Sequence, residues 1–100
     1  MMTKEQQMRK MKATIQGFRY DTDKAILVRE HEQGTYVTDF SYWTAGLYRT
    51  TVAGRYFLAG EGGPMTRFAR RIDANNIAYG ARILPLSDQE AAEWLMEYPE

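Results

Sequence analysis

The sequence predicts a small α+β domain, in which an antiparallel sheet of four to five strands carries a C-terminal helix on one face. Several short runs of β-branched and aromatic residues, separated by turn residues, predict the sheet. A capping box followed by an apolar stripe at helical spacing predicts the helix. The chain has 100 residues, which suits one domain with an adequate core. We expect residues 13–100 to form this domain and the polar, basic residues 1–12 to form a flexible arm.

The first half of the chain predicts a hairpin and a long strand. Residues 14–20 and 25–32 are both strand-like, and the sequence Asp-Thr-Asp-Lys at 21–24 predicts the turn of an antiparallel hairpin. Residues 40–51 predict a third, aromatic strand, in which Gly46 indicates a bulge or a bend.

A glycine-rich segment is expected to end the central strand. Ala53-Gly54 predicts a turn into a strand at 55–59. Gly60, Gly62 and Gly63 can adopt backbone angles that other residues resist, and Pro64 restricts the next position. We therefore expect the strand to end there and the chain to leave the sheet.

The C-terminal part predicts two helices with a strand between them. Phe68 and Ile72 are four residues apart, which predicts a short helix over 65–72. A turn at 73–76 and an alternating fifth strand at 77–84, ending before Pro85, follow. Ser87 and Glu90 form the capping box of the last helix, whose apolar stripe is Ala91, Trp94, Leu95 and Tyr98.

Composition excludes several classes of protein. The chain has no cysteine, which excludes a disulfide framework, a thiolate nucleophile and cysteine-ligated metal and fits a reducing cytoplasm. Its formal net charge is zero, whereas polyanion-binding proteins are usually basic. Neither a membrane span nor a signal peptide is visible, so we expect a cytoplasmic protein with no membrane partner.

Few residue combinations could carry chemistry. A serine triad would need His31, Ser41 and Asp39, which lack a nucleophile-elbow pattern. One histidine with scattered carboxylates gives no metal-ligand spacing. The segment 60–63 lacks the lysine and hydroxyl residue of a phosphate-binding loop. We therefore expect no catalytic residue, no metal site and no cofactor.

Nucleic-acid binding is the alternative that the basic residues favour. Arg67, Arg70 and Arg71 are close in sequence, and together with the N-terminal arm they could contact phosphates. The rings of Tyr48, Tyr56 and Phe68 could stack on bases. The C-terminal helix argues against this, because its charged residues are all acidic.

Three segments together resemble a family of small uncharacterised bacterial proteins carried on phages, plasmids and integrated elements. They are Phe18-Arg-Tyr-Asp-Thr-Asp23, Tyr56-Phe-Leu-Ala-Gly-Glu-Gly-Gly63 and Ile83-Leu-Pro-Leu-Ser-Asp-Gln-Glu-Ala-Ala-Glu-Trp94. The chain departs from the family pattern at Gly17-Phe18 and at Ala59. The resemblance implies no activity or catalytic residue. It implies a mobile-element accessory protein, and such proteins often bind a host protein, for example as anti-CRISPR inhibitors of host defence.

Our leading hypothesis is a non-enzymatic module that binds a host or element-encoded protein. Thirteen of the 100 residues are aromatic, which is more than a core of this size needs. We expect Tyr42, Trp43, Tyr48 and Tyr56 to form a contiguous exposed patch on the sheet face that the helix leaves uncovered. Exposed edge strands would also allow a homodimer.

Overall fold

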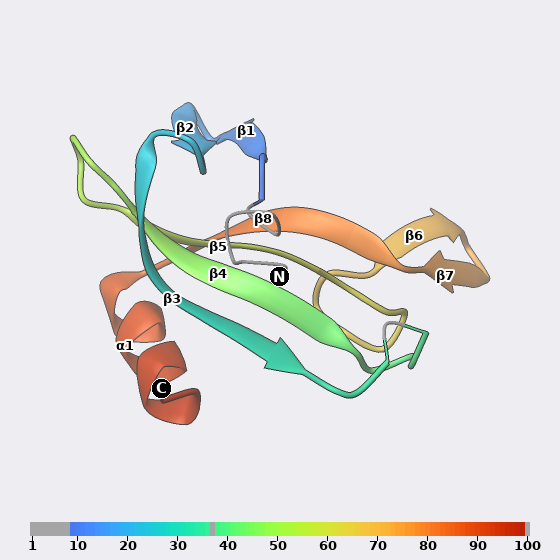
Figure 1. Cartoon of the computed structure of the whole chain (residues 1–100). Coiled ribbons are helices and arrows are strands. Elements are labelled where there is room, and N and C mark those ends of the chain that lie inside the picture. Colours follow the sequence, from blue (N-terminus) through green and yellow to red (C-terminus); the bar gives the residue numbers. More distant parts are fainter. Residues whose placement is uncertain (1–8, 37, 100) are drawn as a thin grey trace.

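A four-stranded antiparallel sheet with one C-terminal helix against it forms the centre of the computed structural model (Figure 1). The structure describes residues 9–36 and 38–99. In chain order, its elements are β1 (Lys12–Ile15), β2 (Phe18–Asp21), β3 (Ala25–Gln33), β4 (Trp43–Thr50), β5 (Tyr56–Gly62), β6 (Arg70–Asp73), β7 (Asn76–Ala78), β8 (Gly80–Leu86) and α1 (Asp88–Glu97). The predicted α+β class, with its sheet and C-terminal helix, is confirmed.

The central sheet has the strand order β3-β4-β5-β8, with every neighbouring pair antiparallel. Because side chains alternate along a strand, β4, β5 and β8 each contribute to two cores. Leu47 and Leu58 pack with Trp94 of α1 on one face, whereas Tyr48 and Phe57 pack in a second cluster on the other. The sheet therefore has an apolar layer on each side.

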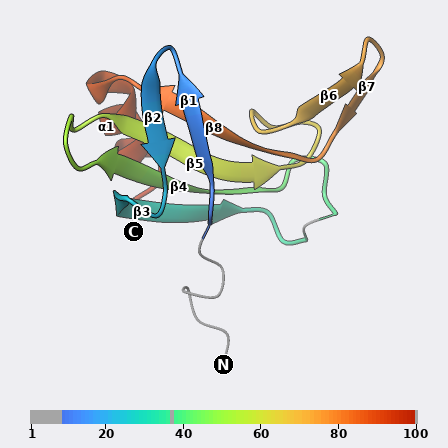
Figure 2. The same cartoon turned by 90° about the horizontal axis from the view of Figure 1, so that it is seen from above.

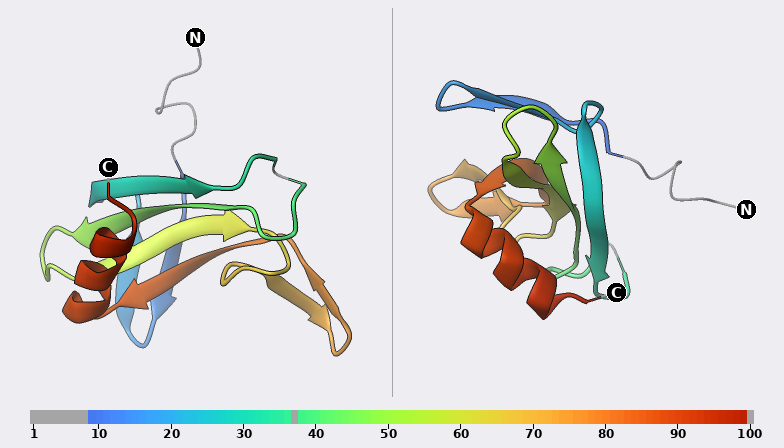
Figure 3. Two further views of the ribbon diagram at one scale, coloured as in Figure 1. Left: turned by 90° about the horizontal axis from the view of Figure 1, so that it is seen from below. Right: turned by 90° about the vertical axis from the view of Figure 1, so that its left-hand side faces the viewer.

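The hairpin β1-β2 covers the face opposite α1, as Figures 2 and 3 show. The ring of Tyr20 meets that of Phe57 edge-on, with 5.2 Å between the centroids. The predicted single strand at 14–20 is wrong, because Gln16 and Gly17 turn the chain with φ of 52° and 85°. The predicted hairpin of 14–20 with 25–32 is also wrong, since β2 pairs with β1 and β3 pairs with β4.

The glycine-rich segment continues β5 instead of ending it. β5 runs to Gly62, and neither Gly60, Gly62 nor Gly63 has a positive φ. Their role is steric: a Cβ at Gly60 would lie 2.5 Å from the carbonyl oxygen of Thr44, and one at Gly62 would lie 2.9 Å from that of Tyr42. The missing side chains allow the neighbouring strand and the 39–42 segment to approach.

The predicted helix at 65–72 is wrong, because this segment forms turns followed by β6. Phe68 is buried in the core while Ile72 is 57% exposed, so their spacing does not mark one helical face. The predicted strand at 77–84 is divided at Tyr79, where β7 pairs with β6 and β8 joins the central sheet. β8 continues through Pro85 to Leu86. Proline has no backbone N–H to donate, and this is tolerated because β8 is an edge strand with a neighbouring strand on one side only.

Side chains satisfy both ends of α1. The Ser87 hydroxyl accepts from the Glu90 amide at 3.0 Å, and the Glu90 carboxylate accepts from the Ser87 amide at 2.8 Å. The predicted capping box is confirmed. At the other end, Nη1 of Arg29 donates to the carbonyl oxygens of Leu95 and Tyr98 at 3.1 and 3.4 Å. A cation from β3 thus serves the last turn, which carries no basic residue of its own.

Candidate functional site

An aromatic cleft lies between the start of β4, the C-terminal end of α1 and the segment 64–69. We call it the tryptophan cleft; its volume is about 650 Å³. The Trp43 ring is packed by its neighbours, with centroid distances of 5.2 Å to Tyr98 and 5.3 Å to His31. Trp94 lies behind them, 6.5 Å from Trp43. The rings form an aromatic wall in which Trp43 is half-buried.

Polar side chains surround this aromatic wall. Gln33, Ser41, Thr66, Arg67 and Glu97 line the cleft with donors and acceptors. Burial, followed by the charge of Glu97 and a hydrogen bond to it, raises the pKa of the Tyr98 phenol, so this group stays neutral and able to donate. An apolar wall with such a border suits a peptide segment, because a side chain can enter while its backbone is hydrogen-bonded at the edge.

The structure separates the four aromatic residues that the sequence placed in one patch. Trp43 lies in the tryptophan cleft, and Tyr56 lies on the same sheet face but lines a different depression, beside Arg49. Tyr42 and Tyr48 are only 8% and 2% exposed. The expected contiguous exposed patch is wrong, because strand alternation directs Tyr48 to the opposite core, where it stacks on Phe57.

A second concave surface, the arginine groove, adjoins the tryptophan cleft. Its volume is about 530 Å³, and Arg70, Arg71 and Arg82 line it together with small and apolar residues. Thr66 lines both sites, so the cleft and the groove meet at this residue. Of the predicted arginines, Arg70 and Arg71 lie in the groove and Arg67 in the cleft. Sequence reasoning missed Arg82, which lies on β8 and comes alongside the segment 64–71, with Nη1 3.5 Å from the Arg67 carbonyl oxygen.

The segment between the two sites is fixed by one buried anchor and one close approach. Phe68 is fully buried, and the Thr66 hydroxyl donates to the carbonyl oxygen of Gly63 at 2.8 Å. Gly80 allows the segment to reach β8, since a Cβ there would lie 2.6 Å from the Phe68 carbonyl oxygen. With Phe68 turned inward, Arg67 and Arg70 are exposed on either side of it.

The arginines of this surface have no carboxylate partner within 4.0 Å in the part of the chain that the structure describes. Nearby acids are held by neutral donors instead. The Asn76 side chain and the Asn75 amide donate to Asp73, which lowers the pKa of that carboxyl. Glu61 accepts from the Tyr79 hydroxyl at 2.8 Å. Among the described residues, the arginines of the groove therefore form no ion pair.

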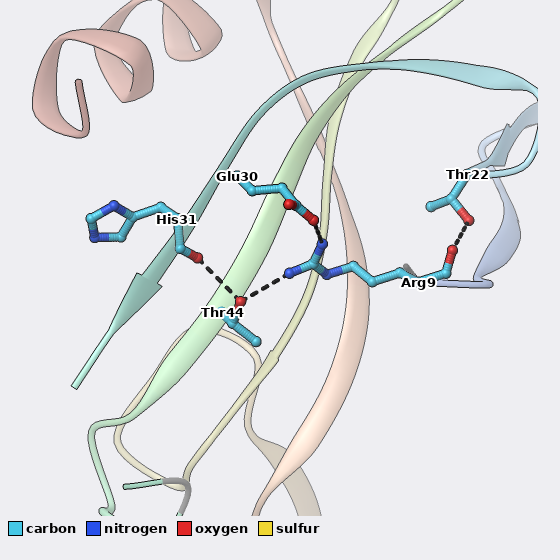
Figure 4. Close-up of polar contacts among 5 residues, drawn as sticks. All are labelled: Arg9, Thr22, Glu30, His31 and Thr44. Carbon is cyan, nitrogen blue, oxygen red and sulfur yellow. Dashed lines mark hydrogen bonds and ion pairs between the residues drawn. The ribbon is translucent and has the colours of Figure 1, made fainter. Parts of the chain in front are cut away.

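A half-buried ion pair fastens the start of the described chain to the opposite sheet face (Figure 4). Nη1 of Arg9 lies 2.8 Å from the Glu30 carboxylate, and Nη2 donates to the Thr44 hydroxyl at 2.9 Å. The Thr22 hydroxyl donates to the Arg9 carbonyl oxygen at 2.8 Å. Of the predicted basic arm, residues 1–8 lie outside the described residues, whereas Arg9 is held and Lys12 begins β1.

Comparison with protein-family models, curated proteins and solved structures finds no match for this chain. Across residues 9–36 and 38–99, no helix is both long and apolar enough to cross a membrane. Within the same residues, no group of three or more His, Cys, Asp or Glu side chains is arranged to hold a metal ion.

Proposed function

We propose that the protein is a non-enzymatic protein-binding module that receives a segment of its partner in the tryptophan cleft. The observation that carries the proposal is the half-buried Trp43 in a cleft of about 650 Å³, bordered by polar groups. Binding energy concentrates on such residues, because a large pre-positioned ring loses little entropy and excludes water from a pocket. The resemblance to mobile-element proteins makes a bacterial host protein, such as a component of a defence system, the partner class to test first.

The polar groups of the cleft favour recognition over turnover. Nε2 of His31 lies 2.9 Å from the Gln33 amide oxygen, and its ring packs at 4.5 Å from that of Tyr98. Among the described residues, no hydrogen bond joins His31 to Ser41. A nucleophile held by its base, as acyl transfer requires, is therefore missing from this wall.

Capture from a bacterial lysate, with mass-spectrometric identification, gives the partner for a quantitative test. Ser41→Trp places a ring in the cleft from an exposed position, while Met96→Trp adds the same ring on the exposed side of α1. By calorimetry, we expect Ser41→Trp and Trp43→Ala to weaken partner binding about 30-fold or more, the loss typical of a binding hot spot. Met96→Trp should bind as the wild type does.

Thermal unfolding of each variant separates binding from folding. Trp43 contacts core residues, so Trp43→Ala alone could lose binding through destabilisation. Ser41→Trp leaves the core intact and decides the question. Undiminished binding by folded Ser41→Trp would refute the proposal.

Nucleic-acid binding by Arg67, Arg70 and Arg71 stays the alternative prediction. One part of it is wrong: Tyr48 and Phe68, which were expected to stack on bases, are buried. The observation that keeps this alternative is that these exposed arginines have no carboxylate within 4.0 Å among the described residues.

A further inference from the structure

We infer that the partner segment is acidic: an apolar residue enters the tryptophan cleft, and aspartates or glutamates beside it enter the arginine groove. This inference rests on the proposed function and assigns the chemistry of what binds. It treats the cleft and the groove as one recognition surface with two parts, one apolar and one cationic.

Continuity between the two parts is the first reason. Thr66 lines both, and the segment from Pro64 to Arg71 forms the ridge between them. Arg67 stands on the cleft side of this ridge, and Arg70 and Arg71 stand on the groove side. An extended peptide that leaves the cleft across Thr66 therefore passes Arg67 before it meets the groove.

Charge is the second reason. Within residues 9–36 and 38–99, Arg71 and Arg82 make only long contacts to carbonyl oxygens, of 3.4 to 3.5 Å, and Arg70 is exposed. Guanidinium groups gathered in one groove repel each other until an anion lies between them. Carboxylates fit them well, because the planar guanidinium donates two parallel hydrogen bonds to both oxygens. The groove thus suits acids that residues 9–36 and 38–99 do not supply.

An acidic peptide suits this surface better than a nucleic acid. The formal net charge of the chain is zero, and Glu97 lines the cleft end of the surface. A phosphate backbone continuing from the groove into the cleft would approach that carboxylate. The groove lining contains no aromatic ring on which a base could stack.

Panning of a random 12-residue phage-display library tests the inference. The wild type, Ser41→Trp and the double variant Arg70→Glu/Arg71→Glu are panned in parallel. Arg19→Glu/Arg49→Glu serves as the matched control, because it changes the same number of exposed arginines outside the groove. We expect the wild type and the control to enrich peptides with one aromatic or aliphatic residue followed by two or more acids.

Synthetic forms of the enriched peptides then give affinities by fluorescence anisotropy. We expect at least tenfold weaker binding to Arg70→Glu/Arg71→Glu, and a similar loss when the peptide acids are replaced by their amides. Affinity should also fall as salt increases. The Arg19→Glu/Arg49→Glu variant should stay within about threefold of the wild type.

Three other outcomes would each refute either the acidic segment, the cleft proposal or peptide binding by the groove. Enrichment of apolar peptides without acids, bound equally by Arg70→Glu/Arg71→Glu, would refute the acidic segment and leave the cleft proposal standing. Enrichment that Ser41→Trp shares with the wild type would refute the cleft proposal itself. If single- or double-stranded 20-nucleotide probes bind the wild type more tightly than any peptide, and Arg70→Glu/Arg71→Glu abolishes this, the groove binds nucleic acid instead.

Discussion

Tyr42 shows how a single side chain on the sheet face opposite α1 is tied to its surroundings. Its hydroxyl donates to the Glu32 carboxylate at 2.6 Å, and its ring is buried. Burial, followed by this hydrogen bond and the charge of Glu32, raises the pKa of Tyr42 to about 12 from an ordinary value of 10.0. The folded protein therefore holds the phenol proton more tightly than the unfolded chain does.

This difference in pKa between the folded and unfolded states makes the free energy of unfolding depend on pH in the alkaline range. A raised folded-state pKa contributes stability in full below the unfolded pKa and loses it as pH rises toward the folded value. Between pH 9 and pH 11, we expect the ionisation of Tyr42 in the unfolded chain to lower the free energy of unfolding by about 1 kcal/mol. Tyr42→Phe should remove this part of the pH dependence. Urea denaturation at the two pH values measures it. Tyr36→Phe, which alters an exposed ring, is the control and should keep the wild-type slope.

At the scale of elements, α1 is capped at both ends. Residues next to the helix form the N-terminal cap, whereas the C-terminal cap comes from Arg29 on β3. The Ser87 hydroxyl satisfies the Glu90 amide. We expect Ser87→Ala to lower the free energy of unfolding by about 1 kcal/mol, whereas Ser87→Asp keeps a side-chain acceptor and stays close to the wild type. Urea denaturation followed by tryptophan fluorescence measures both. Equal losses in the two variants would show that the cap contributes nothing.

Local signals predicted the elements that depend on local interactions, and they failed where distant segments decide the structure. The capping box and the turn at 21–24 are fixed within four residues, and both appear in the structure. Gly60 is explained only by the approach of β4, and Pro85 fits a strand only because β8 lies at an edge. The segment 65–72 was misread as a helix, since its arrangement follows from the burial of Phe68 against other elements.

The same reasoning applies to the candidate site. Trp43, Arg67, Arg70 and Arg71 were predicted as binding residues, and the structure places them in two depressions that share Thr66. The sequence analysis assigned Trp43 to protein binding and the arginines to nucleic-acid binding. No local sequence signal shows that the start of β4 lies beside the segment 64–69. Tyr48 was wrongly predicted to be exposed, since the hairpin that gives the second sheet face its core was not predicted. Tyr42 is buried instead beside Gly34, with its hydroxyl bonded to Glu32.

For the whole molecule, the sheet is stable only if both of its faces are covered. α1 covers one face, and the hairpin β1-β2 covers the other mainly through Tyr20, which is 4% exposed and meets Phe57 edge-on. Two residues earlier on the same strand, Phe18 is 43% exposed and packs under the Arg55 guanidinium. One hairpin thus carries a core ring and a surface ring.

We expect Tyr20→Ala to lower the free energy of unfolding by about 3 kcal/mol, because it removes a buried ring and leaves a cavity over Phe57. Phe18→Ala removes a similar ring from the surface and should cost about 1 kcal/mol or less, mostly the lost contact with Arg55. Urea denaturation of both variants gives the comparison. If the hairpin were an appendage and not a layer of the fold, the two substitutions would cost the same small amount. A larger loss for Tyr20→Ala would show that the second face of the sheet is part of the cooperative unit.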